Sequence, residues 1–528
     1  MSYRPEGLRT LDDEQESPQP AAPAGIGVRG WLRWAWRQLT SMRVALLLLM
    51  LLALAALPGA FFPQTPQDAG AVARYRADQP GLAVWLDRLG LFDVYASPWF
   101  AAIYLLLFVS LIGCILPRTR THLAAMRAAP SRVPRRLRRF PVHATHETAA
   151  SPEEVTAAVR AALGRRFRVA TTPDGVSAER GYLRETGNIV FHLSLVGVLI
   201  ALGLGQVLSY RGQAVVVEDR SFANALVDYD TFTSGSLVDE DRLAPFVLTL
   251  QEMTSEFTVD AQARDFAAHV AITEPDGEVR EDVIRVNHPV EASGANIYLA
   301  GNGFAPHLTV RDAEGEVAFS QPVPFLPEDD FYTSRGVVKV PDVSPGLEQL
   351  GFTGYLLPTA VVDEVGVRSV HPQPNAPLIV LDVYTGDLGL DDGVPQNVYE
   401  LDTTGLTQLT DEEGEVKILL EPGQEVELPD GLGTISFDSL PRFAALDVRY
   451  DPSLTLLLVS ALLAMAGLSA SLFVPRRRLW VKVGAGEGGR TVVEAAALAR
   501  GDDPGLEKEL EHVMTAVRAA GPTSQEDK

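Results

Sequence analysis

The sequence has very little cysteine, because Cys114 is the only one among 528 residues. A single thiol excludes internal disulfides, a CxxC redox pair, a CxxCH haem-attachment site and any zinc or iron–sulfur site with several cysteine ligands. Cys114 lies near the end of an apolar run, where a cysteine usually acts as a small buried hydrophobic residue. The alternative is a thiol with a functional role.

Catalytic motifs are also missing. The chain contains no GxSxG, no Walker-type phosphate loop and no HExxH. The histidines at 269, 288, 307 and 371 show no HxH or HxxxH spacing, so a dedicated metal site has little support. His288 precedes a proline and is expected to stabilise a turn. The motifs therefore predict neither a self-contained catalytic site nor a metal centre.

The net charge of −23 is distributed very unevenly. Residues 209–451 carry 13 Lys and Arg against 44 Asp and Glu, whereas residues 117–186 carry 14 Arg and only 6 acids. Apolar runs separate the two blocks, which indicates two sides of a membrane. A nucleic-acid partner is not expected, because no basic folded face with exposed aromatics is evident.

Four apolar runs are long enough to cross a bilayer core of roughly 30 Å. They cover residues 44–62, 99–116, 189–208 and 454–474. Arginines crowd the loop after the second run, and Arg476, Arg477 and Arg478 follow the fourth. By the positive-inside rule both regions are cytoplasmic. We therefore expect a multi-pass plasma-membrane protein with both termini in the cytoplasm.

The connecting segments differ in character. Residues 1–43 are expected to be disordered and then amphipathic, 63–98 to form an extracytoplasmic loop, and 475–528 to form a cytoplasmic tail with a helix over 503–519. The basic loop 117–188 is expected to contain a small α/β module. Ser151, with Glu154 three residues later, is typical of a capping box that starts a helix reaching Leu163.

Residues 209–453 are rich in short β-type runs separated by turn pairs such as Asp276-Gly277 and Pro422-Gly423. This pattern predicts a large extracytoplasmic, mostly antiparallel β domain of sandwich or barrel type between the third and fourth spans. No 34- or 40-residue repeat is visible, which argues against a solenoid or a propeller.

One imidazole, His192, lies inside the third apolar run. Its ring nitrogens need a hydrogen-bond partner or a metal in that environment. Helix geometry leaves two interpretations open: a hydrogen bond to a carbonyl of a neighbouring helix, or a cofactor or proton role. Gly197, Ala201 and Gly205 form a stripe of small residues on another face of the same helix, suited to close helix packing.

Several blocks of the chain, taken together, resemble the ResB (CcsB) family of system II cytochrome c biogenesis. They are LTSMRVALLLLMLLALAALPGAFFPQ, YASPWFAAIYLLLFVSLIGCILPR, GYLRETGNIVFHLSLVGVLIALG, VNHPVEASGANIYLAGNGFAP, and GTISFDSLPRFAALDVRYDPS with PRRRLWV further on. The similarity extends from Leu39 to about Val481 and includes the order of three spans, a large domain and one span.

The resemblance implies a non-catalytic subunit of a membrane cytochrome c synthase. With a ResC/CcsA-type partner, such a subunit carries haem across the membrane and supports its attachment to apocytochrome c. Residues 209–451 contain no tryptophan, so the tryptophan-rich haem-handling loop must belong to the partner. His192 matches the histidine thought to ligate haem, and Arg180 and Arg184 could face its propionates.

Two other functions compete with this one. A membrane-anchored ligand-binding or sensor module would use the outer β domain for recognition. A small transporter is disfavoured, because the four spans show no inverted repeat or broken helix pair.

Overall fold

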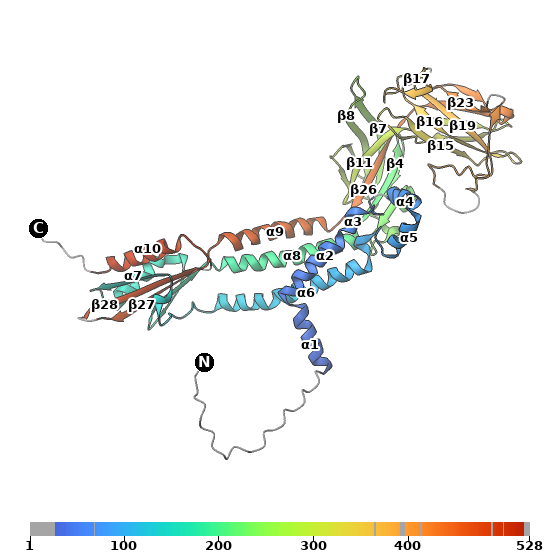
Figure 1. Ribbon diagram of the computed structural model, residues 1–528. Coiled ribbons are helices and arrows are strands. Elements are labelled where there is room, and N and C mark those ends of the chain that lie inside the picture. Colours follow the sequence, from blue (N-terminus) through green and yellow to red (C-terminus); the bar gives the residue numbers. More distant parts are fainter. Residues whose placement is uncertain are drawn as a thin grey trace, which may run out of the picture. The chain divides into compact units, whose positions relative to one another are not determined.

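The computed structural model describes residues 27–67, 69–363, 366–390, 397–411, 414–486, 489–499 and 501–521. The chain forms two compact units, Met1–Ala201 with Leu456–Lys528, and Leu202–Thr455. Figure 1 shows the elements of each unit. The stretch 1–26, predicted to be disordered, lies outside the described residues.

Among the described residues, four helical segments are long and apolar enough to cross a membrane. They are α2 (Met42–Ala56) continued by α3 (Pro58–Phe61), α6 (Pro98–Arg127), α8 (Leu183–Leu208) and α9 (Leu454–Phe473). Many of their leucines are exposed, as expected of side chains that face lipid. The predicted number and order of the spans are thus confirmed (Figure 1).

Two of these helices are longer than the apolar runs that predicted them. Helix α6 continues through Pro117 to Arg127, whereas the run ends at residue 116, and α8 begins at Leu183 rather than at residue 189. An apolar run measures the thickness of the hydrocarbon core, whereas a helix can continue into the polar layer beyond it. Charged residues near the ends of the spans therefore belong to the helices themselves.

Helices α8 and α9 approach each other through small residues. A Cβ placed on Gly467 of α9 would lie 2.6 Å from Phe191 N and 2.7 Å from Gly187 O of α8, so the two backbones are in direct contact. Gly197 faces the Ser460 hydroxyl in the same way, and Ala201 is fully buried. Of the stripe of small residues predicted on α8, Gly197 therefore packs against α9, whereas Gly205 faces Ser453 and Asp451, which precede that helix.

The first helix, α1 (Val28–Leu39), contains the predicted amphipathic segment, and its Trp31, Trp34 and Trp36 are exposed. Helix α6 holds the junction between α1 and α2, because Ser110 donates to Leu39 O and Cys114 Sγ lies 2.9 Å from Thr40 O. The loop between the first two spans contains α4 (Ala69–Asp78) and α5 (Pro80–Arg88) around a small apolar core.

A five-stranded antiparallel sheet has the order β1-β28-β27-β3-β2. Its strands are β1 (Val142–Thr148), β2 (Arg168–Thr172), β3 (Gly175–Arg180), β27 (Arg477–Ala485) and β28 (Thr491–Ala499). Helices α7 (Pro152–Leu163) and α10 (Leu506–Ala519) share its main core. We call this unit the sheet module.

The structure confirms one prediction for the sheet module and differs from another. The helix predicted to start at Ser151 is confirmed as α7, with both hydrogen bonds of the capping box. Residues 475–528, however, are not a tail added to a finished module, because β27 and β28 occupy the middle of its sheet. Gly181, at a φ of 87°, joins β3 to α8 so close to Pro475 O that a side chain would collide there.

The region between α8 and α9 is the predicted large β domain, and every strand ladder described in it is antiparallel. Its first core lies between the sheets β10-β11-β26-β4-β6 and β5-β7-β8-β9. The strands are β4 (Tyr210–Val217), β5 (Ser221–Ala223), β6 (Thr231–Ser234), β7 (Val247–Phe257), β8 (Ala263–Thr273), β9 (Val279–Arg285), β10 (Val290–Ala292), β11 (Ala295–Phe304) and β26 (Arg442–Tyr450).

A second core lies between the sheet β13-β12-β25-β24 and the sheet β14-β15-β16-β19-β20, with β23 paired to β19. The strands are β12 (His307–Arg311), β13 (Val317–Pro322), β14 (Leu326–Pro327), β15 (Ser334–Val340), β16 (Gln349–Leu357), β19 (Leu378–Gly386), β20 (Thr407–Gln408), β23 (Lys417–Leu420), β24 (Glu425–Glu427) and β25 (Thr434–Ser439).

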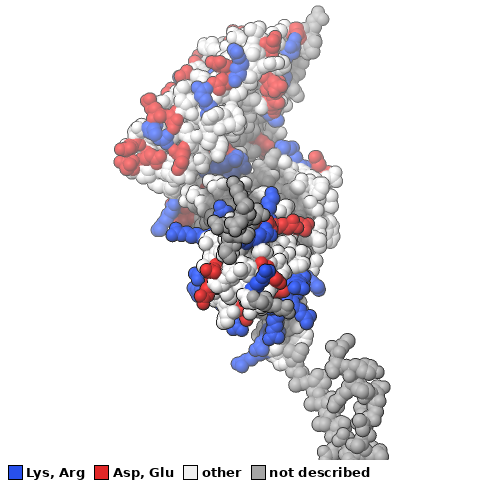
Figure 2. Space-filling view, turned by 90° about the vertical axis from the view of Figure 1, so that its left-hand side faces the viewer, with Lys and Arg blue, Asp and Glu red and all other residues white. Residues whose placement is uncertain are grey.

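Short hairpins complete the domain. They are β17 (Ala360–Asp363) with β18 (Gly366–Ser369), and β21 (Thr410–Asp411) with β22 (Gly414–Glu415). Because each core is shared by two facing sheets, both halves are of sandwich type. Figure 2 shows many carboxylates on the surface of this domain.

Candidate functional site

His192 lies on α8, and its ring is oriented by its own helix. Nδ1 lies 2.8 Å from the carbonyl oxygen of Asn188, one turn earlier. A carbonyl oxygen can only accept, so in the neutral ring Nδ1 carries the hydrogen and Nε2 keeps its lone pair. Metal-binding histidines are commonly oriented in this way, with the second nitrogen donating to a backbone carbonyl. The first of the two interpretations open from the sequence placed the acceptor on a neighbouring helix, whereas the acceptor found among the described residues lies on the same helix as His192.

Three spans surround a small cavity at His192, which we call the histidine cavity. Its volume is about 80 Å³. It is lined by Met42 from α2, by Cys114, Ile115 and Arg118 from α6, and by Asn188, Ile189 and His192 from α8. The wall therefore combines apolar side chains with an imidazole, an amide, a thiol and a guanidinium.

Asn188 contributes an unusual feature to this wall. Its side-chain oxygen Oδ1 is buried and has no hydrogen-bond donor within the part of the chain that the structure describes. Buried polar atoms are nearly always hydrogen-bonded, because an unmade bond costs about 1–3 kcal/mol. An acceptor beside the imidazole is thus available to a bound group.

The size of the histidine cavity limits what it can enclose. Pockets for drug-sized ligands usually measure roughly 300–1,000 Å³, whereas this one measures about 80 Å³. A porphyrin cannot lie wholly inside it in the observed arrangement. A macrocycle bound at Nε2 needs the helices to separate or the ring to lie partly against another surface. The His192 imidazole is a suitable ligand for haem iron, but the histidine cavity is too small to enclose the whole macrocycle.

Cys114 is both part of this wall and part of the helix packing. Its side chain is half-buried, and its thiol contacts Thr40 O, so it is more than an apolar filler. Gly113, beside it, faces the side chain of Thr40. The thiol therefore holds α6 against the α1–α2 junction next to the cavity.

The end of α6 and the start of α8, which lie near the sheet module, carry charged and polar side chains. Arg118 of α6 pairs with Glu185 of α8 at 3.6 Å, and His122 Nε2 lies 3.0 Å from Thr186 Oγ1. Tyr104, near the start of α6, donates to Leu199 O. These contacts align α6 with α8 on both sides of the histidine cavity.

Arg180, proposed on the basis of the resemblance to face propionates, has a structural position instead. Its guanidinium pairs with Glu509 of α10 at 2.5 Å and lies over the Phe167 ring. Both partners belong to the sheet module, so Arg180 joins α10 to the sheet. Arg118, one of the arginines that follow the second apolar run, lines the histidine cavity.

The histidines of the β domain do not form a site. His288 is exposed with Nδ1 3.1 Å from Val286 O, in the turn where it was expected. His307 pairs with Asp438, and His371 contacts Thr258 O. Among the described residues no group of three or more His, Cys, Asp or Glu side chains could hold a metal ion.

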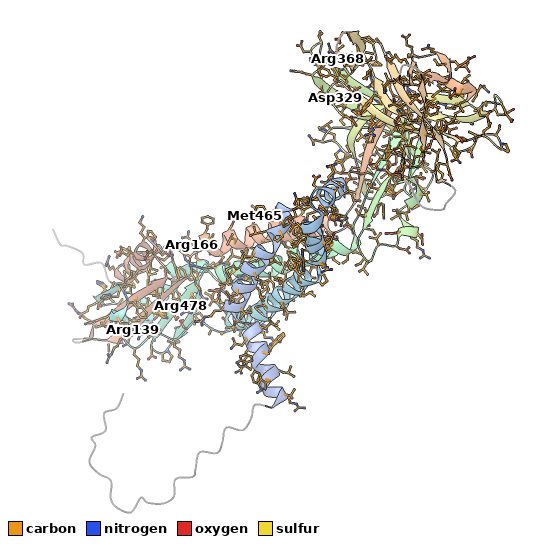
Figure 3. The ribbon with its side chains drawn as sticks, turned by 45° about the vertical axis from the view of Figure 1, so that its right-hand side comes forward. Arg139, Arg166, Asp329, Arg368, Met465 and Arg478 are labelled. Carbon is orange, nitrogen blue, oxygen red and sulfur yellow. The ribbon has the colours of Figure 1, made fainter. Side chains whose placement is uncertain are left out.

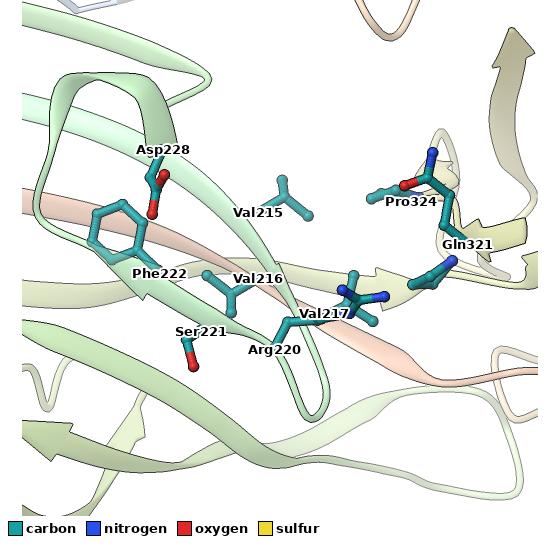
Figure 4. A pocket seen from close by; sticks show the side chains of 10 residues that line it. Val215, Val216, Val217, Arg220, Ser221, Phe222, Asp228, Gln321 and Pro324 are labelled. Atoms are coloured by element: carbon teal, nitrogen blue, oxygen red, sulfur yellow. The ribbon is translucent and has the colours of Figure 1, made fainter. Parts of the chain in front are cut away.

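The β domain also has cavities that a sensor function would need. One of about 320 Å³ is lined by Val215, Val216, Val217, Arg220, Ser221, Phe222, Asp228, Gln321, Pro322 and Pro324 (Figure 4). Its Asp228 carboxylate already accepts a hydrogen bond from Ala223 N, 2.8 Å away. The Asp228 carboxylate is therefore already bound within its own turn. None of the residues that line this cavity is a histidine.

Comparison with known proteins gives the following similarities. The family model described as "ResB-like family" matches residues 42–511. The "Cytochrome c biogenesis protein CcsB" of Synechococcus sp. (strain WH7803) is 27% identical over 271 residues, which cover 50% of this chain and 59% of that protein. Proteins of the same description from Thermosynechococcus vestitus and Gloeobacter violaceus are 26% and 25% identical over 281 and 320 residues, 51% and 55% of this chain. The chain spans 59%, 60% and 63% of the length of these three relatives.

Proposed function

The chain belongs to the ResB-like family, and from this premise we propose that it is a non-catalytic subunit of a cytochrome c synthase complex. With a ResC/CcsA-type membrane protein, it carries haem across the plasma membrane and supports covalent attachment of the haem to apocytochrome c. Haem is the cargo in this function. The curated relatives are named for cytochrome c biogenesis, which supports this assignment.

The proposal of haem binding rests on the environment of one residue, His192. His192 is fixed through Nδ1 to Asn188 O, and its side chain lines a cavity among three candidate spans. A neutral imidazole nitrogen in an apolar wall is a good axial ligand for haem iron. Because the histidine cavity is small, we infer that the partner contributes the rest of the enclosure. A haem site shared between two proteins is expected to leave an incomplete pocket in each of them.

The test is a visible spectrum of the complex purified in detergent after co-expression with the partner. We expect a Soret band that is lost in His192→Ala and retained in His288→Ala, a matched control on an exposed turn. A colourless wild-type complex, or a His192→Ala complex with an unchanged band, would count against haem ligation at His192. Equal recovery of all three proteins on gel filtration is the control for folding.

The orientation can be tested separately. We propose that the sheet module and both termini are cytoplasmic and that the β domain is extracytoplasmic, because arginines follow the second and fourth spans. In a Cys114→Ser background, Asp174→Cys and Asp276→Cys place single thiols at exposed turns of the module and the β domain. A membrane-impermeant maleimide is expected to label Asp276→Cys in intact cells and Asp174→Cys only after lysis. The reverse pattern would invert the topology.

A further inference from the structure

Most of helix α1 is left uncovered by the rest of the described chain. None of its residues from Val28 to Leu39 is buried, and Val28, Trp31 and Leu32 are exposed to 77%, 57% and 65%. Figure 1 shows α1 projecting from the other helices of its unit, and Figure 3 shows the same arrangement from a second direction. Large apolar side chains that are exposed together mark a surface that another component covers.

The side chains of α1 are sorted by face. At about 100° per residue, most of its apolar side chains fall within an arc of roughly 100°. This apolar stripe consists of Val28, Trp31, Leu32, Ala35 and Leu39. Arg29, Arg33 and Arg37 recur every four residues and form an arginine stripe, whose centre lies roughly 150° from that of the apolar stripe. Trp34 and Trp36 lie on the two borders between the stripes.

The arginine stripe has no anionic partner within the part of the chain that the structure describes. No ion pair joins Arg29, Arg33 or Arg37 to a carboxylate there, and α1 itself contains no acidic residue. Arginines near a membrane surface are attracted to anionic lipid headgroups. The three charges are therefore available to an anion that the described residues do not supply.

The position of α1 in the chain indicates what covers it. Only Thr40 and Ser41 separate its end at Leu39 from Met42, the first residue of α2 and of the first candidate span. The 12 residues of α1 extend about 18 Å, which is too short to cross a bilayer core of roughly 30 Å. Arginines on one face, apolar side chains on the other and tryptophans at the borders are typical of a helix that lies in the plane of the headgroup layer.

The end of α1 is fixed to the helix that forms one wall of the histidine cavity. Ser110 of α6 donates to Leu39 O, and Cys114 Sγ lies 2.9 Å from Thr40 O. Cys114 and Met42, on the two sides of this junction, line the histidine cavity. A helix held in the headgroup layer therefore ends directly beside the histidine cavity.

We propose that α1 is an in-plane membrane anchor, which lies in the headgroup layer at the end of the membrane where α2 begins. The apolar stripe is buried at the boundary with the acyl chains, and the arginine stripe binds the phosphate groups of anionic lipids, because a guanidinium offers several donors to one phosphate. Trp34 and Trp36 lie at the level of the headgroups, where the indole ring is favoured. This anchor is independent of the proposed function and of which side of the membrane is cytoplasmic.

The first test compares two adjacent positions of α1 in the full chain reconstituted in nanodiscs. Leu32→Cys on the apolar stripe and Arg33→Cys on the arginine stripe, each in a Cys114→Ser background, carry a single nitroxide label. Both positions are exposed, so a label fits at either of them. We expect the Leu32→Cys label to collide more with oxygen, which concentrates among the acyl chains, and the Arg33→Cys label to collide more with a water-soluble nickel chelate.

Each of the other patterns overturns the anchor. Two labels that collide mainly with nickel place α1 in water, and two that collide mainly with oxygen remove its in-plane orientation. A Leu32→Cys label shielded from both reagents shows that protein covers the apolar stripe, for which the acidic segment 1–26 of this chain is one source.

The second test measures which lipids the arginine stripe holds, with spin-labelled lipids in the same nanodiscs. We expect Arg29→Gln/Arg33→Gln/Arg37→Gln to reduce by about half the excess of phosphatidylglycerol over phosphatidylcholine in the motionally restricted lipid, because three cationic contacts are lost. The charge-matched control replaces three exposed arginines of the sheet module, of which Figure 3 labels the last: Arg160→Gln/Arg165→Gln/Arg166→Gln. An equal loss in this control, or no loss in the α1 variant, overturns lipid binding by the arginine stripe.

Discussion

Replacement of His192 by glycine is expected to reduce maturation of c-type cytochromes at least about tenfold, and added imidazole is expected to restore part of it. The substitution removes the lone pair at Nε2 and leaves a hole the size of the ring in the histidine cavity. Loss even of groups that only support a metal ligand costs about 10–100-fold in affinity, so loss of the ligand itself should reduce maturation at least about tenfold. Free imidazole can enter the hole and supply the missing nitrogen.

The measurement is haem-stained cytochrome c from cells in which this chain and its partner are the only maturation system. His288→Gly, on an exposed turn of the β domain, is the control and should mature cytochromes normally with or without imidazole. Rescue specific to position 192 separates ligation from folding, because a misfolded protein gains nothing from imidazole. Full maturation in His192→Gly without imidazole would contradict the assignment.

Leucine at Gly467 is expected to separate α8 from α9 and to prevent accumulation of folded protein. A Cβ at this position would stand 2.6 Å from Phe191 N and 2.7 Å from Gly187 O, and these are backbone atoms that cannot rotate away. Overpacking of a close contact typically costs about 1–3 kcal/mol, and backbone collision places this variant at or above that range. Association of spanning helices depends on such close packing, because lipid tails offer no hydrophobic driving force.

The matched control is Ala466→Leu, which adds similar apolar volume at the preceding, exposed position of α9. Fluorescence-detected gel filtration and a thermal melt of the detergent-solubilised protein measure the effect. We expect a monodisperse peak with an unchanged melting temperature for Ala466→Leu, and a reduced, aggregated peak for Gly467→Leu. Equal behaviour of the two variants would show that α8 and α9 are not held together at this contact.

Local patterns in the sequence predicted much of this architecture. The four spans follow from apolar length, α7 from the Ser151–Glu154 capping box, and the α8–α9 contact from the stripe of small residues that includes Gly197. Each of these signals lies within a few turns of chain. The hydrophobic and steric terms that produce them are local as well, so one sequence suffices to find them.

The parts that escaped prediction depend on distant pairing. Nothing local in β27 or β28 says that they insert between β1 and β3, some three hundred residues away in the sequence. Arg118 lines the histidine cavity because α6 continues as a helix beyond its apolar run, and this continuation was not predicted. The hydrogen bond of the His192 ring goes to the backbone carbonyl of Asn188, which any residue at that position would supply, so nothing in the sequence indicated that the ring is oriented by its own helix.

The strand order of the sheet module also has a temporal consequence. On the ribosome, β1, β2, β3 and α7 are complete long before β27 and β28, which form the centre of the sheet. Until the last strands arrive, β1 and β3 have no ladder between them, and their open edges must be shielded from other chains. A chain that ends before β27 therefore lacks the two strands that join β1 to β3, and it is expected to expose the facing edges of both strands.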